Sequence, residues 1–395
     1  MLIVGGGPAG AAAAIRLADA GRSALVIDKA EFPRDKCCGD GPTTLALRLL
    51  EELDFDPSTV ASWFPVDDVY LRSPNGREMT LPLPRDTGAY AAVARRTDPD
   101  AALVGLARAR GAEVRENTAM TDVRPAADHV DVQVGDETIR ARYVIGADGM
   151  WSPTRKALGL NVEGYRGEWH AFRQYRRANG PESRQLWVWF EPDLLPGYAW
   201  SFPLPDGVVN VGFGIVRGDS MSGASLAALW RDLLERPHIA RVLGEHEAEG
   251  PHRAWPIPAR LPEIGLVGPR TFFVGDAATA TDPMTGEGIG QALETGMLAA
   301  DAIVAAGALQ PGVAAARYEH TARAALSTDH RFAAALSTVL RSPRRTEAAL
   351  GTIDANDWTR RNFARWMFED YPRALILTPR RWKRGMFTGD GAWVA

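Results

Sequence analysis

The sequence predicts an α/β protein in which a parallel sheet is interleaved with an antiparallel sheet and followed by C-terminal helices. Three observations lead to this prediction. A glycine-rich turn follows the first apolar strand, two later strands run into Asp–Gly or Gly–Asp pairs, and the segments between them carry alternating aromatic residues. Glycine turns at the ends of buried strands are typical of a Rossmann-type nucleotide-binding domain.

The composition narrows the function classes. The chain has 395 residues, of which 46% are hydrophobic and 24% charged, and its net charge is −4. Such a chain is globular and lacks the basic excess of most nucleic-acid-binding proteins, so we expect no nucleic-acid partner. The two cysteines, Cys37 and Cys38, are adjacent and can form neither a disulfide framework nor a metal site. We therefore expect a protein of the reducing cytoplasm without a metal ion.

The N-terminal segment reads as strand, glycine turn, helix and strand. The turn satisfies G-x-G-x-x-G, which combines a tight turn, close approach of the backbone to a pyrophosphate and a helix N-terminus that faces the phosphate charge. Asp28 ends the second strand, where a carboxylate can accept hydrogen bonds from ribose hydroxyls. A tight turn that binds nothing is the alternative. The predicted nucleotide contacts are Gly5, Gly7, Pro8, Ala9, Gly10, Asp28 and Lys29.

Two further motifs occupy strand ends later in the chain. A strand at residues 143–147 runs into a D-G-x-x-S-x-x-R pattern, and a strand at residues 271–274 runs into Gly-Asp, then D-P-x-x-G-E-G-I and a long helix. Together with the N-terminal turn, this set resembles the FAD-binding motifs of the flavoprotein group that includes para-hydroxybenzoate hydroxylase, flavin halogenases and geranylgeranyl reductases. The resemblance covers residues 1 to about 305 and implies FAD as cofactor. Because no histidine or cysteine is evidently placed for a covalent link to the flavin, we expect FAD to be bound non-covalently.

The resemblance also assigns roles to single residues. It implies that Asp276 binds the ribityl chain and that the helix after Gly286 directs its N-terminus at the pyrimidine edge of the flavin. Partial positive charge at that helix start stabilises the anionic reduced flavin. The residues of the two later motifs that we expect at the cofactor are Asp148, Gly275, Asp276, Pro283, Gly286, Gly288 and Ile289.

The motifs also predict how the chain divides. An FAD-binding domain comprises residues 1–60, 96–160 and 265–305, a substrate-binding domain comprises residues 61–95 and 161–264, and a helical region comprises residues 306–395. In the substrate-binding domain, Trp187 and Trp189 share one face of a strand, and Tyr198, Trp200 and Phe202 share one face of the next. These aromatic side chains form either a wall over the flavin and along an apolar channel or the packed core of the sheet.

One segment distinguishes the branches of the flavoprotein group. Residues 198–203 read Y-x-W-x-F-P and precede Asn-Val-Gly at 210–212, which resembles the signature of geranylgeranyl reductases. Members of that family reduce isolated double bonds in the prenyl chains of archaeal lipids, chlorophyll and menaquinone. Residues 32–41 resemble the family's C-G-[GD]-G loop, and residues 96–100 resemble the start of its next helix. We therefore expect Arg34, Cys38, Gly39 and Arg96 at the flavin, and Cys38, Tyr198 and Trp200 at the reacting atoms.

The implied reaction transfers a hydride from reduced FAD to one carbon of an alkene, while an acid protonates the other carbon inside an apolar tunnel. Cys38 is the candidate proton donor, because a thiol stays protonated near neutral pH unless a cation such as Lys36 lowers its pKa. Alternatively, Cys38 is only a small residue that fits beside the ring. The substrate would be an apolar small molecule. No second G-x-G-x-x-G follows a strand, so docked NAD(P)H or another external reductant would supply the electrons.

The sequence leaves two other functions open. The first is an oxygen-using flavin enzyme: a hydroxylase, a halogenase or an oxidative dehydrogenase. Halogenation is disfavoured, because none of the four lysines lies in residues 60–100, where a flavin halogenase would carry its lysine. The second is a prenyl-binding protein without catalysis, which would have no need of a complete set of FAD motifs.

The C-terminal tail carries a basic and aromatic run, Arg-Arg-Trp-Lys-Arg, at residues 380–384. Such a run is either a solvated surface or a site that binds anionic lipid headgroups. The chain starts directly in an apolar strand, and no uncharged apolar run approaches the length of a membrane span. We therefore expect a cytoplasmic protein, with peripheral membrane contact as an alternative and the oligomeric state left open.

Overall fold

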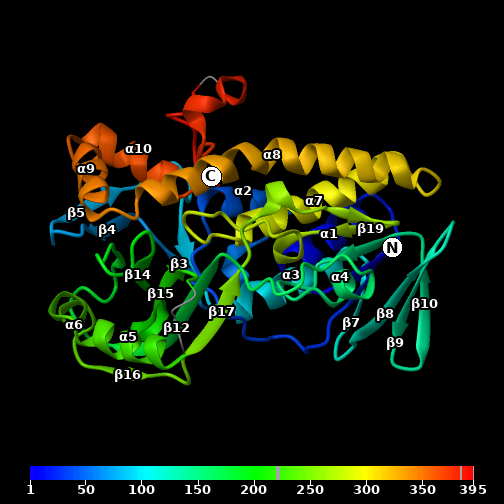
Figure 1. The fold of residues 1–395 in the computed structure, drawn as a ribbon, viewed down its shortest axis with the longest axis horizontal. Helices are drawn as coiled ribbons and strands as arrows, with labels where there is room; N and C mark the ends of the chain where they lie inside the picture. Colours follow the sequence, from blue (N-terminus) through cyan, green and yellow to red (C-terminus); the bar gives the residue numbers. More distant parts are fainter. Residues whose placement is uncertain (219–222, 383–384, 395) are drawn as a thin grey trace.

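A six-stranded sheet organises one half of the molecule (Figure 1). The computed structural model describes residues 1–218, 223–382 and 385–394. The strand order is β18-β19-β11-β1-β2-β7, and all neighbours are parallel except β18 and β19. The strands are β1 (Leu2–Val4), β2 (Leu25–Ile27), β7 (Glu113–Arg115), β11 (Val144–Gly146), β18 (Val267–Gly268) and β19 (Thr271–Phe273). The central strands are apolar throughout, as is typical of parallel strands covered on both faces.

Helices cover one face of this sheet, and a small antiparallel sheet covers the other. The helices are α1 (Pro8–Asp19), α3 (Thr97–Ala109) and α7 (Ile289–Ala306), and the opposite layer comprises β8 (Met120–Pro125), β9 (Val130–Val134), β10 (Glu137–Ala141) and α4 (Pro153–Ala157). A Cβ atom on Gly296 of α7 would lie 2.1 Å from the carbonyl oxygen of Ala9 in α1. Because Gly296 has no side chain, these two helices can pack at very short range.

The second large sheet is mixed but almost entirely antiparallel. Its order is β16-β12-β15-β14-β13-β4-β5, with β17 also paired to β12, and only β13 and β4 run parallel. The strands are β4 (Asp68–Arg72), β5 (Glu78–Pro82), β12 (Trp169–Ala178), β13 (Leu186–Trp189), β14 (Tyr198–Pro203), β15 (Val208–Val216), β16 (His246–Ala248) and β17 (Arg253–Ile257). The short strands β3 (Phe64–Pro65) and β6 (Ala92–Val93) pair separately.

The two aromatic stripes of this sheet face opposite sides. Trp187 lies opposite Ser201 in the strand register, whereas Val188 lies opposite Trp200. Trp187 and Trp200 therefore project from different faces of the sheet. Trp187 and Trp189 are buried in a core with residues of α5 (Gly223–Glu235) and α6 (Pro237–Leu243). The packing interpretation therefore holds for these two residues, and the wall interpretation remains for the stripe on β14.

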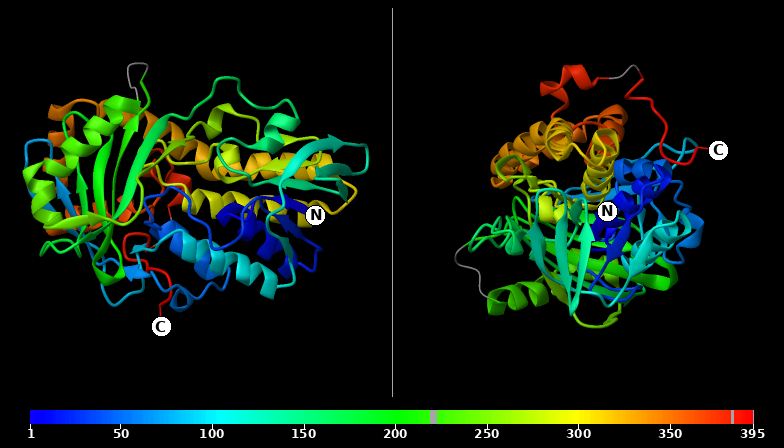
Figure 2. Two further views of the ribbon diagram at one scale, coloured as in Figure 1. Left: turned by 90° about the horizontal axis from the view of Figure 1, so that it is seen from below. Right: turned by 90° about the vertical axis from the view of Figure 1, so that its right-hand side faces the viewer.

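Four further helices complete the fold and confirm the predicted fold class. They are α2 (Thr44–Glu52), α8 (Pro311–Val339), α9 (Pro343–Ile353) and α10 (Asp357–Met367). Helix α8 runs along the long axis of the molecule, and α9 and α10 lie over the second sheet at its far end (Figures 1 and 2). Residues 383 and 384 of the basic run lie outside the described residues. No helix in the described part of the chain is long and apolar enough to cross a membrane.

Candidate functional site

A cavity of about 1470 Å³ connects the two large sheets and the C-terminal helices. It begins at the glycine turn after β1, passes over β14 and continues between α8, α9 and α10. A small-molecule site usually occupies roughly 300 to 1,000 Å³, so this cavity has room for more than one ligand. Every predicted site residue lines the cavity except Gly10 and Pro283.

The glycine turn leaves the start of α1 open to the cavity. Gly5 has a φ of +103°, and a Cβ atom there would lie 2.3 Å from the carbonyl oxygen of Ala147. The cap residue of α1 is Gly7, and no side chain caps the helix, so its first N–H groups remain available to an anion. Gly10 acts by packing, because its Cβ would lie 1.9 Å from the Gly5 carbonyl oxygen.

A cation and a carboxylate flank this turn. The Arg34 guanidinium would lie 3.3 Å from a Cβ on Gly7, and it is held 3.4 Å from Asp100 and 4.9 Å from the Phe32 ring centre. Asp28 accepts hydrogen bonds from the backbone of Gly6 at 2.7 Å and of Ala30 at 2.9 Å. An open helix start beside an arginine, with a carboxylate at the neighbouring strand end, fits the pyrophosphate and ribose of FAD.

Asp276 is paired to the lysine that the sequence placed beside Cys38. Lys36 Nζ lies 2.8 Å from Asp276 Oδ2. Burial raises the pKa of Asp276, but the Lys36 ammonium, the Arg96 guanidinium and a hydrogen bond from Thr281 together lower it by more, so the net pKa lies below its ordinary value. Lys36 therefore does not lower the pKa of the Cys38 thiol, because an acidic residue distant in sequence engages its ammonium group. The cation that acts on Cys38 is Arg96.

Cys38 lies in a closed setting. Burial raises the pKa of its thiol, and the opposing effect of the Arg96 guanidinium is smaller, so the thiol is protonated at neutral pH. Arg96 is itself fixed by a two-pronged hydrogen bond to Asp100, with distances of 2.9 and 2.8 Å. Cys38 Sγ accepts a hydrogen bond from the backbone N–H of Asp40 at 3.3 Å. Burial likewise raises the pKa of Cys37 to about 12.

Asp40 is a site residue that the sequence reasoning missed. The hydroxyl of Tyr175 and Nδ2 of Asn210, the latter at 2.7 Å, both donate to its Oδ2, while Oδ1 has no partner in the described residues. Burial raises the pKa of Asp40 to about 6, against the lowering effect of Tyr175 and nearby arginines. Oδ1 of Asn210 accepts a hydrogen bond from Trp200 Nε1 at 3.1 Å, which joins Asp40 to the aromatic stripe.

The stripe on β14 forms one wall of the cavity. Successive ring centres of Tyr198, Trp200 and Phe202 lie 5.9 and 6.0 Å apart. A Cβ on Gly212 would lie 2.4 Å from Trp200 Cζ2, so the indole can lie flat only because residue 212 is glycine. The Tyr198 hydroxyl donates to the carbonyl of Thr285, which attaches this wall to the loop before α7.

The loop at residues 282–288 closes the start of α7. Oε1 of Glu287, which the sequence reasoning also missed as a site residue, accepts hydrogen bonds from the N–H groups of Ile289 at 2.9 Å and Gly290 at 3.1 Å. Burial raises the pKa of Glu287. Pro283 does not line the cavity, and its carbonyl accepts a hydrogen bond from Trp169 Nε1 at 2.9 Å. Among the chain's own groups, Glu287 therefore occupies the helix start that was expected to face the flavin.

Asp148 lines the cavity and also accepts hydrogen bonds from residues of its own turn. Its two carboxylate oxygens accept hydrogen bonds from Ser152 Oγ and from the N–H of Thr154, both at 2.7 Å. These contacts hold the turn into α4, so the D-G-x-x-S pattern shapes the cavity wall in addition to any contact with the cofactor.

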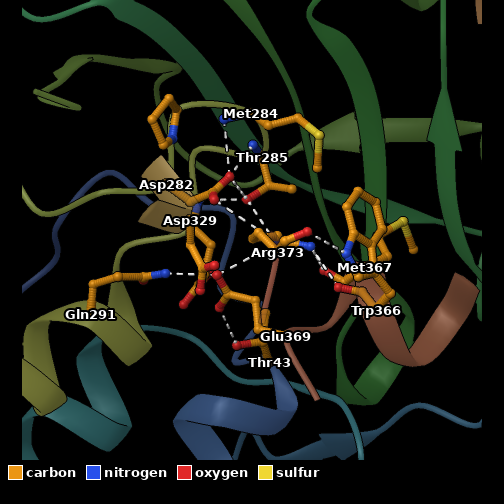
Figure 3. A network of polar contacts seen from close by, with 12 residues as sticks. Thr43, Asp282, Met284, Thr285, Gln291, Asp329, Trp366, Met367, Glu369 and Arg373 are labelled. Carbon is orange, nitrogen blue, oxygen red and sulfur yellow. Dashed lines mark hydrogen bonds and ion pairs between the residues drawn. The ribbon is translucent and has the colours of Figure 1, made fainter. Parts of the chain in front are cut away.

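A buried ionic network attaches the same loop to the C-terminal segment (Figure 3). Arg373 lies 3.4 Å from Asp282 and 3.4 Å from Glu369. Glu369 also accepts hydrogen bonds from Gln291 of α7 at 2.7 Å and from Thr43 at 3.0 Å. Burial raises the pKa of Glu369. Burial also raises the pKa of Asp282, but Arg373, His330 and the hydrogen bonds from Thr285 together lower it by more.

Comparison with known proteins identifies the family to which this chain is similar. The model of a family described as FAD binding domain matches residues 1–306. The chain is 33% identical over 333 residues to a menaquinone reductase of Mycolicibacterium smegmatis, covering 78% of this chain and 76% of that protein. It is 30% identical over 321 residues to a digeranylgeranylglycerophospholipid reductase of Methanopyrus kandleri, covering 78% and 80%. A geranylgeranyl bacteriochlorophyll reductase-like structure from Thermoplasma acidophilum matches with a TM-score of 0.79 at 24% identity, covering 96% and 98%.

Replacement of Gly10 by alanine should abolish FAD binding, because the added Cβ would lie 1.9 Å from the Gly5 carbonyl oxygen and force the turn open. Gly105→Ala in α3 is the matched control, since a Cβ there meets no atom within 4 Å. FAD content is read from the flavin absorbance of the purified variants. Full FAD content in Gly10→Ala would show that this turn does not bind the cofactor.

Replacement of Asp40 by asparagine should change how stability depends on pH. The folded-state pKa of about 6 exceeds the reference value of 3.8, so the contribution of Asp40 is fully present below about pH 4 and is lost as pH rises through 6. A difference of that size corresponds to about 3 kcal/mol. Urea unfolding measures the free energy of unfolding at pH 4 and at pH 8. Between these two pH values, Asp40→Asn should lose less unfolding free energy than wild type does. Equal losses would contradict the raised pKa, and Asp136→Asn on the exposed β9–β10 turn serves as control.

Proposed function

The chain belongs to the FAD binding domain family and is an FAD-dependent oxidoreductase of the geranylgeranyl reductase type, and we propose that it reduces isolated carbon–carbon double bonds of an isoprenoid chain. The predicted resemblance to geranylgeranyl reductases is thereby confirmed. The relatives are named for the reduction of menaquinone and of digeranylgeranylglycerophospholipid. For this chain, the substrate is an apolar prenyl compound such as a prenylated quinone or a geranylgeranyl lipid.

The observation that carries this proposal is the apolar extension of the cavity beyond the glycine turn. From the wall on β14, the cavity continues between apolar side chains of the C-terminal helices, among them Phe332, Leu350, Phe363, Met367 and Leu375. A prenyl chain is long, narrow and without polar groups, so a tunnel with few hydrogen-bonding groups suits it. An aromatic substrate of specialised metabolism would leave most of this length unfilled.

The chain's own residues supply the remaining chemistry. Reduced FAD, when bound, supplies the hydride. The Cys38 thiol gives its proton to the second alkene carbon, and the Arg96 guanidinium favours the thiolate that remains. Asp40, a buried acid whose backbone N–H donates to Cys38 Sγ, returns a proton to the sulfur, and Tyr175 and Asn210 hold its carboxyl group in place. Trp200 and its neighbours on β14 exclude water and fix the alkene over the flavin.

One structural feature argues against the halogenase alternative. Lys29 and Lys36 are the only lysines that line the cavity in the described residues, and both lie at its nucleotide end. Lys36 is paired with Asp276. The part of the cavity at β13 and β14 therefore presents no lysine to a substrate. An external reductant, either NAD(P)H or a reduced carrier, provides the electrons in this proposal.

Trp200→Ala should slow alkene reduction by about a hundredfold, because displacement of a substrate by about 1 Å can cost that factor. Trp187→Phe, on the opposite face of the sheet, should leave the rate within a few fold of wild type. The assay is anaerobic single-turnover oxidation of the reduced flavin by a prenylated quinone. A wild-type rate in Trp200→Ala would exclude the β14 wall from substrate positioning.

Cys38→Ser should slow the same step while FAD content and flavin reduction stay normal, because serine nearly preserves size but is a far weaker acid than a thiol. Cys37→Ser provides the matched control at the adjacent position. Stopped-flow spectroscopy separates flavin reduction from reoxidation by substrate. If both variants reoxidise as fast as wild type, the proton comes from another group.

A further inference from the structure

The far end of the tunnel reaches the molecular surface beside α10. Trp358 and Phe387 line the cavity and are nevertheless 61% and 46% exposed. Their ring centres lie 6.4 Å apart, and Phe387 also packs against Tyr371, another lining residue, at 5.2 Å. The apolar interior is therefore continuous with apolar surface at this point, which we call the tunnel mouth.

Two further large apolar side chains flank the tunnel mouth. Leu377 is 64% exposed and Trp382 is 56% exposed. Trp382 Nε1 donates to the carbonyl of Leu375, a lining residue, at 2.8 Å, so the indole is held against the segment that borders the tunnel. Figures 1 and 2 show this C-terminal segment, in red, projecting beyond the body of the molecule. Soluble surfaces expose single apolar residues routinely, whereas a cluster of this kind marks an interaction site.

The surroundings of the tunnel mouth are positively charged. Among the described residues 331–382, the exposed arginines are Arg331, Arg341, Arg344, Arg345, Arg361 and Arg380, whereas Asp357 is the only exposed acid, although the whole chain carries a net charge of −4. Arg361 lies one helical turn after Trp358, and Arg380 lies between Leu377 and Trp382; both are exposed and have no carboxylate partner in the described residues. The exposed Asp357 of α10 and the half-buried Asp354 that follows α9 are both paired with Arg360, so neither offsets the charge of the exposed arginines.

We propose that the tunnel mouth docks onto an anionic lipid membrane. Tryptophan side chains are favoured at the level of lipid headgroups, and arginines beside them are attracted by anionic lipids. An acidic partner protein could match the positive charge of this surface. An anionic bilayer matches the charge and in addition presents an apolar phase to the apolar tunnel. The isoprenoid chain then passes from the bilayer to the flavin without crossing water.

The test is co-sedimentation of the FAD-loaded enzyme with vesicles of phosphatidylcholine, with and without phosphatidylglycerol. Wild type should bind the anionic vesicles and release them as salt rises. Each arginine near a membrane contributes about fivefold in affinity, so Arg361→Gln with Arg380→Gln should weaken binding about 25-fold. The double variant Leu377→Ser with Trp382→Ser should also weaken vesicle binding, even with both arginines intact. Arg22→Gln and Leu309→Ser, exposed at the opposite lobe, should bind as wild type does.

Failure of wild type to bind, or wild-type binding by both double variants, would overturn the proposal. A dimer in light scattering that the same variants dissociate, without vesicle binding, would instead assign the surface to a second copy of the chain. The binding measurement requires no turnover, so it stands apart from the proposed reaction. In activity assays, Leu377→Ser with Trp382→Ser should lower kcat/KM for a long prenyl substrate embedded in vesicles but not for a short soluble one.

Discussion

The buried guanidinium of Arg373 determines how the two parts of the site fit together. It contacts Asp282 in the loop before α7 and Glu369 after α10, and it donates to the backbone carbonyls of Trp366 at 2.6 Å and Met367 at 3.0 Å (Figure 3). One cation thus joins the loop expected to meet the flavin to the helix that covers the tunnel. Removing one partner of a buried ion pair costs about 3 to 5 kcal/mol, so the helix and the loop form one unit.

This network also explains how an apolar tunnel can border a group of charged residues at the loop before α7. The carboxyl groups of Asp282 and Glu369 point into the network, and their hydrogen bonds are satisfied by Thr285, Gln291 and Thr43. On the opposite wall, Trp200 is fixed by Gly212 beneath it and by its bond to Asn210. The interior is therefore lined by apolar side chains whose positions are set by buried polar contacts behind them.

The sequence predicts those parts of the site that depend on local chain geometry. The glycine turn, the Asp28 strand end and the loop before α7 are each short segments whose conformation follows from their own residues. Asp40, Glu287 and Arg373 could not be found in this way. Asp40 is buried by strands that lie 135 and 170 residues away, and its raised pKa follows from that burial.

Two further features depend on contacts between segments that are distant in sequence. Lys36 stands two residues before Cys38, but its partner, Asp276, is 240 residues away. Strand alternation correctly places Trp187 with Trp189 on one face, yet only the register with β14 shows that this face is turned away from the cavity. The helical character of residues after 306 is readable from sequence, whereas their position over the tunnel follows from Arg373 and the long α8.

The central claim is that this flavoprotein adds hydrogen to an isoprenoid double bond. The most direct measurement is the mass of a prenylated quinone after anaerobic mixing with photoreduced, FAD-loaded enzyme. The account predicts that the product gains two hydrogens for each flavin reoxidised, and that air is not required. An unchanged prenyl chain, together with hydroxylation of an aromatic compound only when oxygen is present, would contradict it.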